Sequence, residues 1–234
     1  MVDLVVNSHS SNNEVIKLFY HCYRLFAWRF NLIFFTDPGN RKFIYDVFHD
    51  IPVNVIEYEP EAFSLQMSRL LENFSSELLI WFNEDYIPFG SVDWESLDFC
   101  LNLMESDLSV KQIRLARGYN FTGKIFANKL YEMSAKQRFL YSQTPALWRV
   151  EELKLLYNSI SPSGIGRKNK SEPQAEVLVD NELRKRCSRS NVAKHLVWFD
   201  GEEKQGRFHY WSSLLPTLTS IVVDGSVNNE FDNE

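Results

Sequence analysis

The strongest candidate for chemistry in this sequence is a group of polar residues that follows a strongly apolar segment. Leu78–Phe82 is continuously apolar, as in a strand buried on both faces, and the run stops at Asn83-Glu84-Asp85. Carboxylates at such a strand end can hold a hard divalent cation that also binds a diphosphate. Taken without its context, the segment favours the simpler alternative, a strand end whose acidic side chains are solvated.

Two earlier segments have the same form, a β-type run followed by polar residues. Leu4–Val6 is followed by the polar stretch 7–13, and Asn31–Thr36 ends at the turn-forming residues Asp37-Pro38-Gly39-Asn40. Further strands are expected at Val53–Tyr58 and Lys111–Ala116, and helices from near Glu14 and over Arg41–His49, Phe63–Phe74, Val92–Met104 and Ala146–Asn158.

Strands that alternate with helices predict an α/β fold, a Rossmann-like and mainly parallel sheet with flanking helices and right-handed crossovers. Ligands of such sheets bind beyond the carboxyl ends of the strands, so the polar residues after Val6, Thr36 and Phe82 should share one edge. Residues 1–224 are expected to form a single domain, with a mobile loop over Ser161–Glu172. Residues 225–234 are expected to form a frayed, acidic C-terminal tail.

The composition indicates a folded domain and makes nucleic acid an unfavourable partner. Of the 234 residues, 44% are hydrophobic, which is enough for a substantial core. The net charge of −6 provides no general attraction to a phosphate backbone, although a local basic groove would be compatible with it. Three distant cysteines, Cys22, Cys100 and Cys187, suit a reducing compartment better than a disulfide framework.

Several motifs are absent, and their absence narrows the function. The chain has no Gly-x-Gly-x-x-Gly or Walker-type loop, which disfavours dinucleotide oxidoreductases and P-loop enzymes, and no Gly-x-Ser-x-Gly nucleophile elbow. It has no signal-peptide pattern and no apolar run of the roughly 20 residues that span a bilayer. A cytoplasmic protein is therefore expected, located in the host cytoplasm if the chain is viral.

Four segments together resemble a known family, the small GT-A-fold glycosyltransferases of bacterial and large-DNA-virus type. These segments, which extend the resemblance over most of the chain, are Ser64–Leu71, Asn83–Tyr86, Val92-Asp93 and Tyr141–Arg149. The resemblance implies a GT-A-like fold and transfer of a hexosyl or pentosyl group from a nucleoside diphosphate sugar, with a UDP-sugar favoured.

In the resembled family, an Asp-x-Asp type motif at the end of a central strand binds Mn²⁺ or Mg²⁺, which bridges the phosphates of the donor. Asn83 and Asp85 occupy the two positions here, and Glu84 is a second candidate at the donor site. Asn83 in place of the first Asp is a departure from the family pattern. It removes one negative charge but leaves a neutral oxygen ligand.

The resemblance also implies that the first loop and the end of the second strand receive the nucleobase and ribose. The residues at these positions are Asn7, Ser8, His9 and Asp37. Asp37 can either accept a hydrogen bond from the nucleoside or initiate the Asp-Pro-Gly turn. Arg69 either contacts the diphosphate or lies on a solvated helix face.

On the acceptor side, the resemblance places Gln143 and Trp148 near the incoming sugar. Trp148 can stack on a sugar or belong to the core, and its helical context favours the core. A carboxylate that follows this segment serves as general base in the resembled family. Glu176 is chosen for that role over Glu172 and Asp180.

The predicted function is metal-dependent, inverting transfer of a sugar to a hydroxyl acceptor. A glycan is the favoured acceptor over a modified nucleobase in viral DNA, and the oligomeric state is left open. The late residues His209 and Tyr210 either close over the donor phosphates or are structural.

The alternative functions are a nucleotidyltransferase and a non-catalytic GT-A-like interaction domain. Residues 7–13 contain no glycine or basic residue for a nucleotidyltransferase phosphate loop, whereas Asn83 favours the non-catalytic domain.

Overall fold

The computed structural model describes most of the chain. The described residues are 2–24, 29–88, 90–115, 124–136, 140–162, 168–189 and 193–199, together with the short strands 209–210, 217–218, 222–223 and 226–227. Within this part, no helix combines the length and apolarity needed to cross a bilayer.

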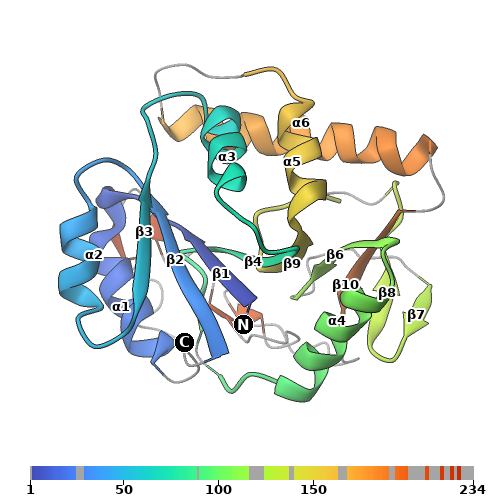
Figure 1. Cartoon of the computed structure of the whole chain (residues 1–234), viewed down its shortest axis with the longest axis horizontal. Coiled ribbons are helices and arrows are strands. Elements are labelled where there is room, and N and C mark those ends of the chain that lie inside the picture. Colours follow the sequence, from blue (N-terminus) through green and yellow to red (C-terminus); the bar gives the residue numbers. More distant parts are fainter. Residues whose placement is uncertain are drawn as a thin grey trace.

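A nine-stranded sheet forms the centre of the described structure, in the order β3-β2-β1-β4-β9-β6-β10-β8-β7 (Figure 1). The strands are β1 (Val2–Asn7), β2 (Phe30–Thr36), β3 (Val53–Glu57), β4 (Leu78–Asn83), β6 (Val110–Arg114), β7 (Ile125–Ala127), β8 (Leu130–Glu132), β9 (Ala146–Arg149) and β10 (Lys194–Trp198). The first four strands along the chain pair in parallel, and β10 is parallel to β6. The predicted α/β fold with a mainly parallel sheet is confirmed.

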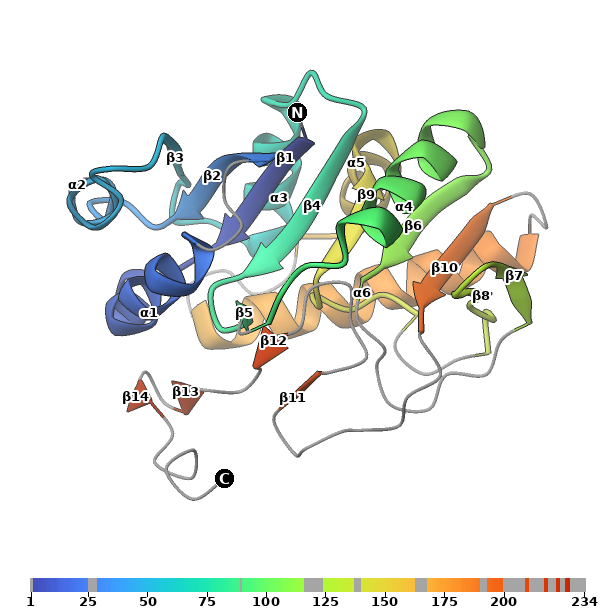
Figure 2. The ribbon, with the colours of Figure 1, turned by 90° about the horizontal axis from the view of Figure 1, so that it is seen from below.

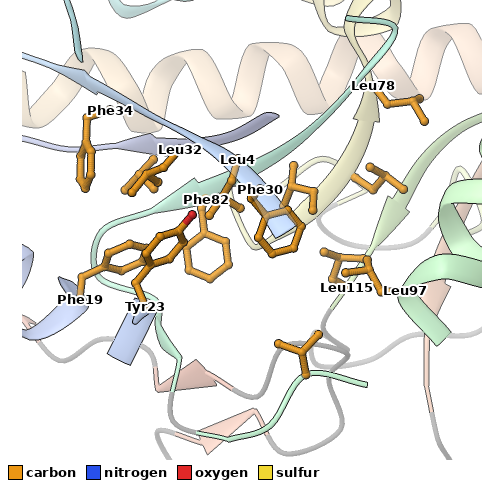
Figure 3. Packing of buried hydrophobic residues seen from close by; sticks show 14 of the residues in the cluster. Leu4, Phe19, Tyr23, Phe30, Leu32, Phe34, Leu78, Phe82, Leu97 and Leu115 are labelled. Atoms are coloured by element: carbon orange, nitrogen blue, oxygen red, sulfur yellow. The ribbon is translucent and has the colours of Figure 1, made fainter. Parts of the chain in front are cut away.

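Helices cover both faces of this sheet. They are α1 (Asn13–Tyr23), α2 (Arg41–Val47), α3 (Phe63–Glu72), α4 (Trp94–Ser106), α5 (Val150–Asn158) and α6 (Lys168–Arg189), with the short 3-10 helix η1 (Ser10–Asn12) before α1. Side chains of α1, α2 and α4 pack on one face, and those of α3, α5 and α6 pack on the other. In Figure 3, Phe19 and Tyr23 of α1 lie against Leu32 and Phe82 of the sheet.

The continuous apolar run of β4 is explained by this double covering. Leu78, Ile80 and Phe82 enter the core on the α1 side, and Leu79 and Trp81 enter the core on the α3 side. Successive side chains of a strand point to opposite faces, so a strand covered on both faces needs apolar residues at every position.

Beyond β1, the chain builds the sheet in both directions, through β2 and β3 on one side and through β4 on the other. The boundary between β1 and β4 is therefore a topological switch point, where the loops after neighbouring strands diverge and leave room for a ligand. The polar segments after β1 and β4 lie at this point.

Two expectations about the second half of the chain were wrong. Ala146–Asn158 was expected to be one helix, but its first four residues form β9, which is inserted antiparallel between β4 and β6. Leu147 and Trp148 point to opposite cores, as in a strand, and a short apolar run does not distinguish the two structures. The expected loop Ser161–Glu172 is helical from Lys168, where α6 begins, and residues 163–167 lie outside the described part.

Segments near the C-terminus return to the end of β4. The strand β12 (Thr217–Leu218) pairs with β5 (Ile87–Pro88) and with β11 (His209–Tyr210), as Figure 2 shows. The expected frayed tail contains a paired strand, because β14 (Ser226–Val227) forms a hairpin with β13 (Val222–Val223). Residues 228–234 lie outside the described part.

Arg149, at the junction of β9 and α5, ties this inserted strand to the end of α4. Its buried guanidinium donates through Nε to Val110 O at 2.9 Å, and through Nη2 to Asp107 O at 3.2 Å and to Met104 O. These carbonyls belong to the end of α4 and the start of β6. Only a planar group with several N–H donors, such as the guanidinium, can reach all three carbonyl oxygens.

We expect Arg149→Lys to lower the free energy of unfolding by about 2 kcal/mol, because a lysine cannot satisfy the same buried carbonyls. Urea unfolding monitored by circular dichroism measures the change. The control is Arg41→Lys, since Arg41 is half-exposed and forms a surface ion pair with Glu57 at 3.4 Å. Equal losses in the two variants would show that the Arg149 fork contributes no special stability.

Candidate active site

The polar segments that follow β1, β2 and β4 meet at the carboxyl edge of the sheet, as the sequence predicts. The Ser8 N–H donates to Phe35 O at 2.8 Å, and the Glu84 N–H donates to Asn7 O at 3.1 Å. Main-chain hydrogen bonds therefore continue past the strand ends and hold the three segments side by side.

Two buried carboxylates anchor the first of these segments. Asp37 accepts hydrogen bonds from Ser10 N at 2.7 Å and from Ser10 Oγ at 2.6 Å, one on each carboxylate oxygen. Glu84 accepts one from Asn12 Nδ2 at 2.6 Å. The loop and the start of α1 are thus held between the ends of β2 and β4.

His9 and Asp37 also have defined structural roles. His9 Nδ1 accepts a hydrogen bond from Ser11 N at 3.0 Å, and its Nε2 lies 3.7 Å from Asp37 Oδ2. Asp37 O accepts a hydrogen bond from Asn40 N at 3.4 Å, and Gly39 has a φ of 87°, which favours glycine. The turn that Asp37 is expected to initiate is present, and its carboxylate also anchors Ser10.

Three residues predicted for the site from separate segments form one hydrogen-bonded chain. Asn83 Nδ2 donates to Gln143 Oε1 at 3.0 Å, and the Gln143 N–H donates to Glu176 Oε1 at 3.1 Å. These residues come from β4, the loop before β9, and α6. The candidate cation ligand, acceptor-binding residue and general base are therefore neighbours.

Asp180, the alternative base, is already engaged. Its Oδ1 accepts a hydrogen bond from Tyr141 N at 2.8 Å, and its Oδ2 accepts one from Arg184 Nε at 2.7 Å. One helical turn separates it from Glu176, so both carboxylates hold the same loop. The side chain of Glu172, the other alternative, lies outside the described part.

Buried polar atoms without a hydrogen-bond partner point to a ligand at this place. They include Asn83 Oδ1, Asp85 Oδ1 and Gln143 Nε2. A buried polar atom left unpaired costs about 1–3 kcal/mol, which a ligand with the complementary group would recover.

Asn83 Oδ1 and Asp85 Oδ1 suit a hard divalent cation, because both are oxygens and one carries charge. Within the described residues, no group of three or more His, Cys, Asp and Glu side chains is placed to hold a metal ion. A cation here would therefore take two oxygen ligands from the protein and the others from phosphate or water. This is the usual arrangement for Mg²⁺ on a phosphate substrate.

Burial perturbs the acidity of the two central carboxyl groups. Desolvation raises the pKa of Asp85 from 3.8 to about 6. Burial also raises the pKa of Glu176, an effect opposed by the hydrogen bond from Gln143 N and by the charge of Arg114, and reinforced by the charge of Asp180. Carboxyl groups with strongly perturbed pKa values are typical of functional sites.

Two predicted site residues lie apart from this cluster. Trp148 is 1% exposed and packs between Tyr141 and His195, so it belongs to the core and offers no face to a sugar. Its position in a central strand under α5 and α6 is the reason. Arg69 is in the last turn of α3, is mostly exposed and pairs with Glu61 at 3.1 Å.

Three residues with defined roles at this edge were missed by the sequence analysis. Ser10 and Asn12 fix the first loop, and Arg114 is 3% exposed and ends β6 at the carboxyl edge. The position of Arg114 near the end of an expected strand was the available signal. Ser10 and Asn12 carried no signal, since their partners are distant in the sequence.

Comparison with known proteins identifies the fold. No protein-family model and no curated protein sequence matches the chain. Among solved structures, 4-diphosphocytidyl-2C-methyl-D-erythritol synthase from Anaerococcus prevotii is similar, with a TM-score of 0.50 and 12% identity over 88% of this chain and 92% of that one.

Two other solved structures are similar to the chain over most of its length. UDP-glucose pyrophosphorylase complexed with UDP-glucose has a TM-score of 0.52 and 8% identity over 85% of this chain and 90% of that one. TarS residues 1–349 from S. aureus has a TM-score of 0.51 and 15% identity over 85% of this chain and 58% of that one. The chain therefore has the Rossmann-like α/β fold common to nucleotidyltransferase and GT-A structures.

We expect Asp85→Asn to stabilise the cation-free protein at pH 8 by up to about 3 kcal/mol, the equivalent of raising a pKa from 3.8 to about 6. Because the folded-state pKa lies above the unfolded value, the ionised carboxylate destabilises the fold. The penalty should be absent below pH ~4 and complete above pH ~6.

Urea unfolding with a chelator, repeated across this pH range, measures the difference. Asp46→Asn, on the exposed side of α2, is the control and should show no such trend. A difference between Asp85→Asn and the wild-type protein that stays constant with pH would contradict the burial of an ionisable Asp85.

Proposed function

We propose that this chain is a glycosyltransferase that moves a sugar from a nucleoside diphosphate sugar to a hydroxyl acceptor. The observation that supports this most directly is the chain Asn83–Gln143–Glu176, with hydrogen bonds of 3.0 and 3.1 Å. It joins a candidate ligand for the cation on the leaving diphosphate to a candidate base for the attacking hydroxyl. Glycosyl transfer requires these two functions on either side of one anomeric carbon.

Asn83 and Asp85 would hold Mn²⁺ or Mg²⁺, which when bound would supply positive charge to the departing diphosphate. Gln143 orients the first of these ligands, because its Oε1 accepts from Asn83 Nδ2 and so turns Asn83 Oδ1 away. Oδ1 is then the atom left without a protein partner. An amide fixed in this way compensates in part for the missing first carboxylate.

Glu176 would accept the proton of the acceptor hydroxyl as that oxygen attacks the anomeric carbon. Its raised pKa favours this role, since a general base works best when its pKa approaches the working pH. The bond from Gln143 N to Oε1 fixes the carboxylate on the side of the cation ligands. A single base facing a leaving group supports inversion at the anomeric carbon.

The nucleoside of the donor would lie over the loop held by Asp37 and Glu84, at the switch point beside β1. The loop is preorganised by hydrogen bonds of 2.6 and 2.7 Å, so little ordering would accompany binding. The resemblance of the sequence favours a UDP-sugar. A glycan hydroxyl is favoured over a DNA base because of the acidic net charge of −6.

A nucleotidyltransferase is the second candidate, because similar solved structures include a pyrophosphorylase and a synthase of that type. Such an enzyme needs donors for a triphosphate after the first strand. Residues 7–13 here contain no glycine and no lysine or arginine, and the η1 loop is occupied by its own anchoring bonds. Sugar transfer is therefore the better fit to this site.

A non-catalytic domain would explain the Asn at position 83, but it would not explain the unpaired, buried oxygen of Asp85.

We expect calorimetry to show manganese-dependent binding of UDP in preference to GDP, and loss of that dependence in Asp85→Ala. The removed carboxylate is the charged oxygen ligand of the proposed cation site. Asp46→Ala removes the same charge from an exposed position and should bind as the wild-type protein does. If neither nucleotide binds the folded protein with manganese, the proposed donor site is wrong.

We expect Glu176→Gln to lower sugar transfer or donor hydrolysis by 10²-fold or more while UDP binding stays the same, since proton transfer contributes roughly 10²–10⁴-fold. Turnover of the wild-type enzyme should fall as pH drops through the raised pKa of Glu176. Glu182→Gln, at a residue that lies further along α6 in an ion pair with Arg186, is the control. Equal turnover in both variants would exclude Glu176 as the base.

A further inference from the structure

Two of the buried polar atoms without a hydrogen-bond partner are donors that the proposed cation site does not use. Trp81 Nε1 and Gln143 Nε2 are buried and have no hydrogen-bond partner. Trp81 is 2% exposed and Gln143 is 8% exposed. Neither atom serves the cation site proposed above, because an N–H group cannot coordinate a cation.

The strand register brings Arg114 to the same place. Ala146 of β9 lies directly opposite Trp81 of β4 on one side and opposite Arg114 of β6 on the other. Residues directly opposite one another share a face of the sheet, so Trp81 and Arg114 flank the small side chain of Ala146. Gln143 precedes Ala146 by three residues, in the loop that leads into β9.

This face is the one covered by α3, α5 and α6, since Trp81 and Ala146 pack with Leu153 and Val179. Arg114 is 3% exposed, and its Nη2 is fixed by a hydrogen bond to Leu140 O at 3.3 Å. A buried guanidinium carries a full charge in nearly every protein environment. Two neutral donors and one cation thus gather around a residue whose side chain is a single methyl group.

We infer that Trp81, Arg114 and Gln143 form a subsite around Ala146 that binds an anionic oxygen group, a phosphate or a carboxylate. Such a group is the ligand that several N–H donors and a guanidinium satisfy together. The inference rests on the proposed function for its place in the reaction. Glu176 borders this subsite through Gln143, and a base must face the acceptor, so the anionic group belongs to the acceptor.

The proposed subsite implies a chemical class for the acceptor. The acceptor is a hydroxyl compound that also carries a phosphate or carboxylate near the attacked oxygen, rather than a neutral glycan. The nucleotide would occupy the other side of β4, over the ends of β1 and β2. Donor and acceptor anions are then held by different residues, the donor by Asn83 and Asp85 with a cation and the acceptor by Arg114.

The test uses the indole N–H signals of ¹⁵N-labelled protein, which has six tryptophans. Sodium phosphate and, separately, sodium acetate are titrated in at constant ionic strength, and Trp81→Phe identifies the signal of Trp81. We expect a saturable shift of that signal with at least one of the two anions, and the anion that is bound more tightly names the group. No saturable shift with either anion would overturn the subsite.

Two variants test the composition of the subsite. Arg114→Gln should abolish the shift, and Ala146→Val should also abolish it while keeping every donor, because a larger side chain at the position between Trp81 and Arg114 would compete with the bound anion. Trp81→Phe, followed through the side-chain amide signals of Gln143, should weaken anion binding roughly fivefold to tenfold. Arg29→Gln is the control, since Arg29 pairs at 2.6 Å with Asp98 of α4, which covers the opposite face of the sheet, and should leave the shift intact.

The same titration with UDP and manganese present separates the two proposals. A shift that persists beside bound UDP supports an acceptor subsite. A shift that UDP abolishes would show that these donors hold the phosphates of the nucleotide, and the acceptor assignment would be wrong. Anion binding in a protein that binds no nucleotide would overturn glycosyl transfer and leave only the anion site itself.

Discussion

The hydrogen bonds that hold residues 140–143 determine the geometry of the candidate site. This segment is neither helix nor strand, so its buried main-chain groups need partners from elsewhere. Asp180 and Glu176 of α6 accept from Tyr141 N and Gln143 N, and Arg114 of β6 donates to Leu140 O. The same contacts that satisfy the segment bring a carboxylate of α6 to the end of β4.

Glu176 consequently has two functions that are compatible. It anchors the loop through one oxygen and remains a half-buried carboxylate with a raised pKa, because the bond from Gln143 N only partly offsets desolvation. Asp180 lacks this freedom, since both of its oxygens are engaged. Side chains that both hold a loop in place and take part in the reaction are common where an active-site loop must be rigid.

The sequence predicted the parts of this arrangement that depend on local pattern. The apolar run of β4 predicted a doubly covered strand that ends beside Asn83 and Asp85, because such a strand has a recognisable composition. The role of these two residues as cation ligands came from the family resemblance. The insertion of β9 was not predictable, since Ala146–Arg149 is short and suits a helix equally well. Because β9 was not predicted, neither the contact between Asn83 and Gln143 nor the core position of Trp148 could be predicted. Both depend on contacts between residues that are distant in the sequence, and Asn83 and Gln143 are 60 positions apart.

Solved structures with this fold include a 4-diphosphocytidyl-2C-methyl-D-erythritol synthase, a UDP-glucose pyrophosphorylase and a protein named TarS, so the fold alone does not specify the reaction. The central claim is that the bond broken lies between the sugar and the diphosphate. Phosphorus NMR of the protein with manganese tests it directly, with UDP-sugars in one sample and nucleoside triphosphates plus sugar phosphates in another. Our account predicts release of UDP from a UDP-sugar, by transfer or by slow hydrolysis, and no pyrophosphate. Pyrophosphate from the second sample, with no UDP from the first, would contradict it.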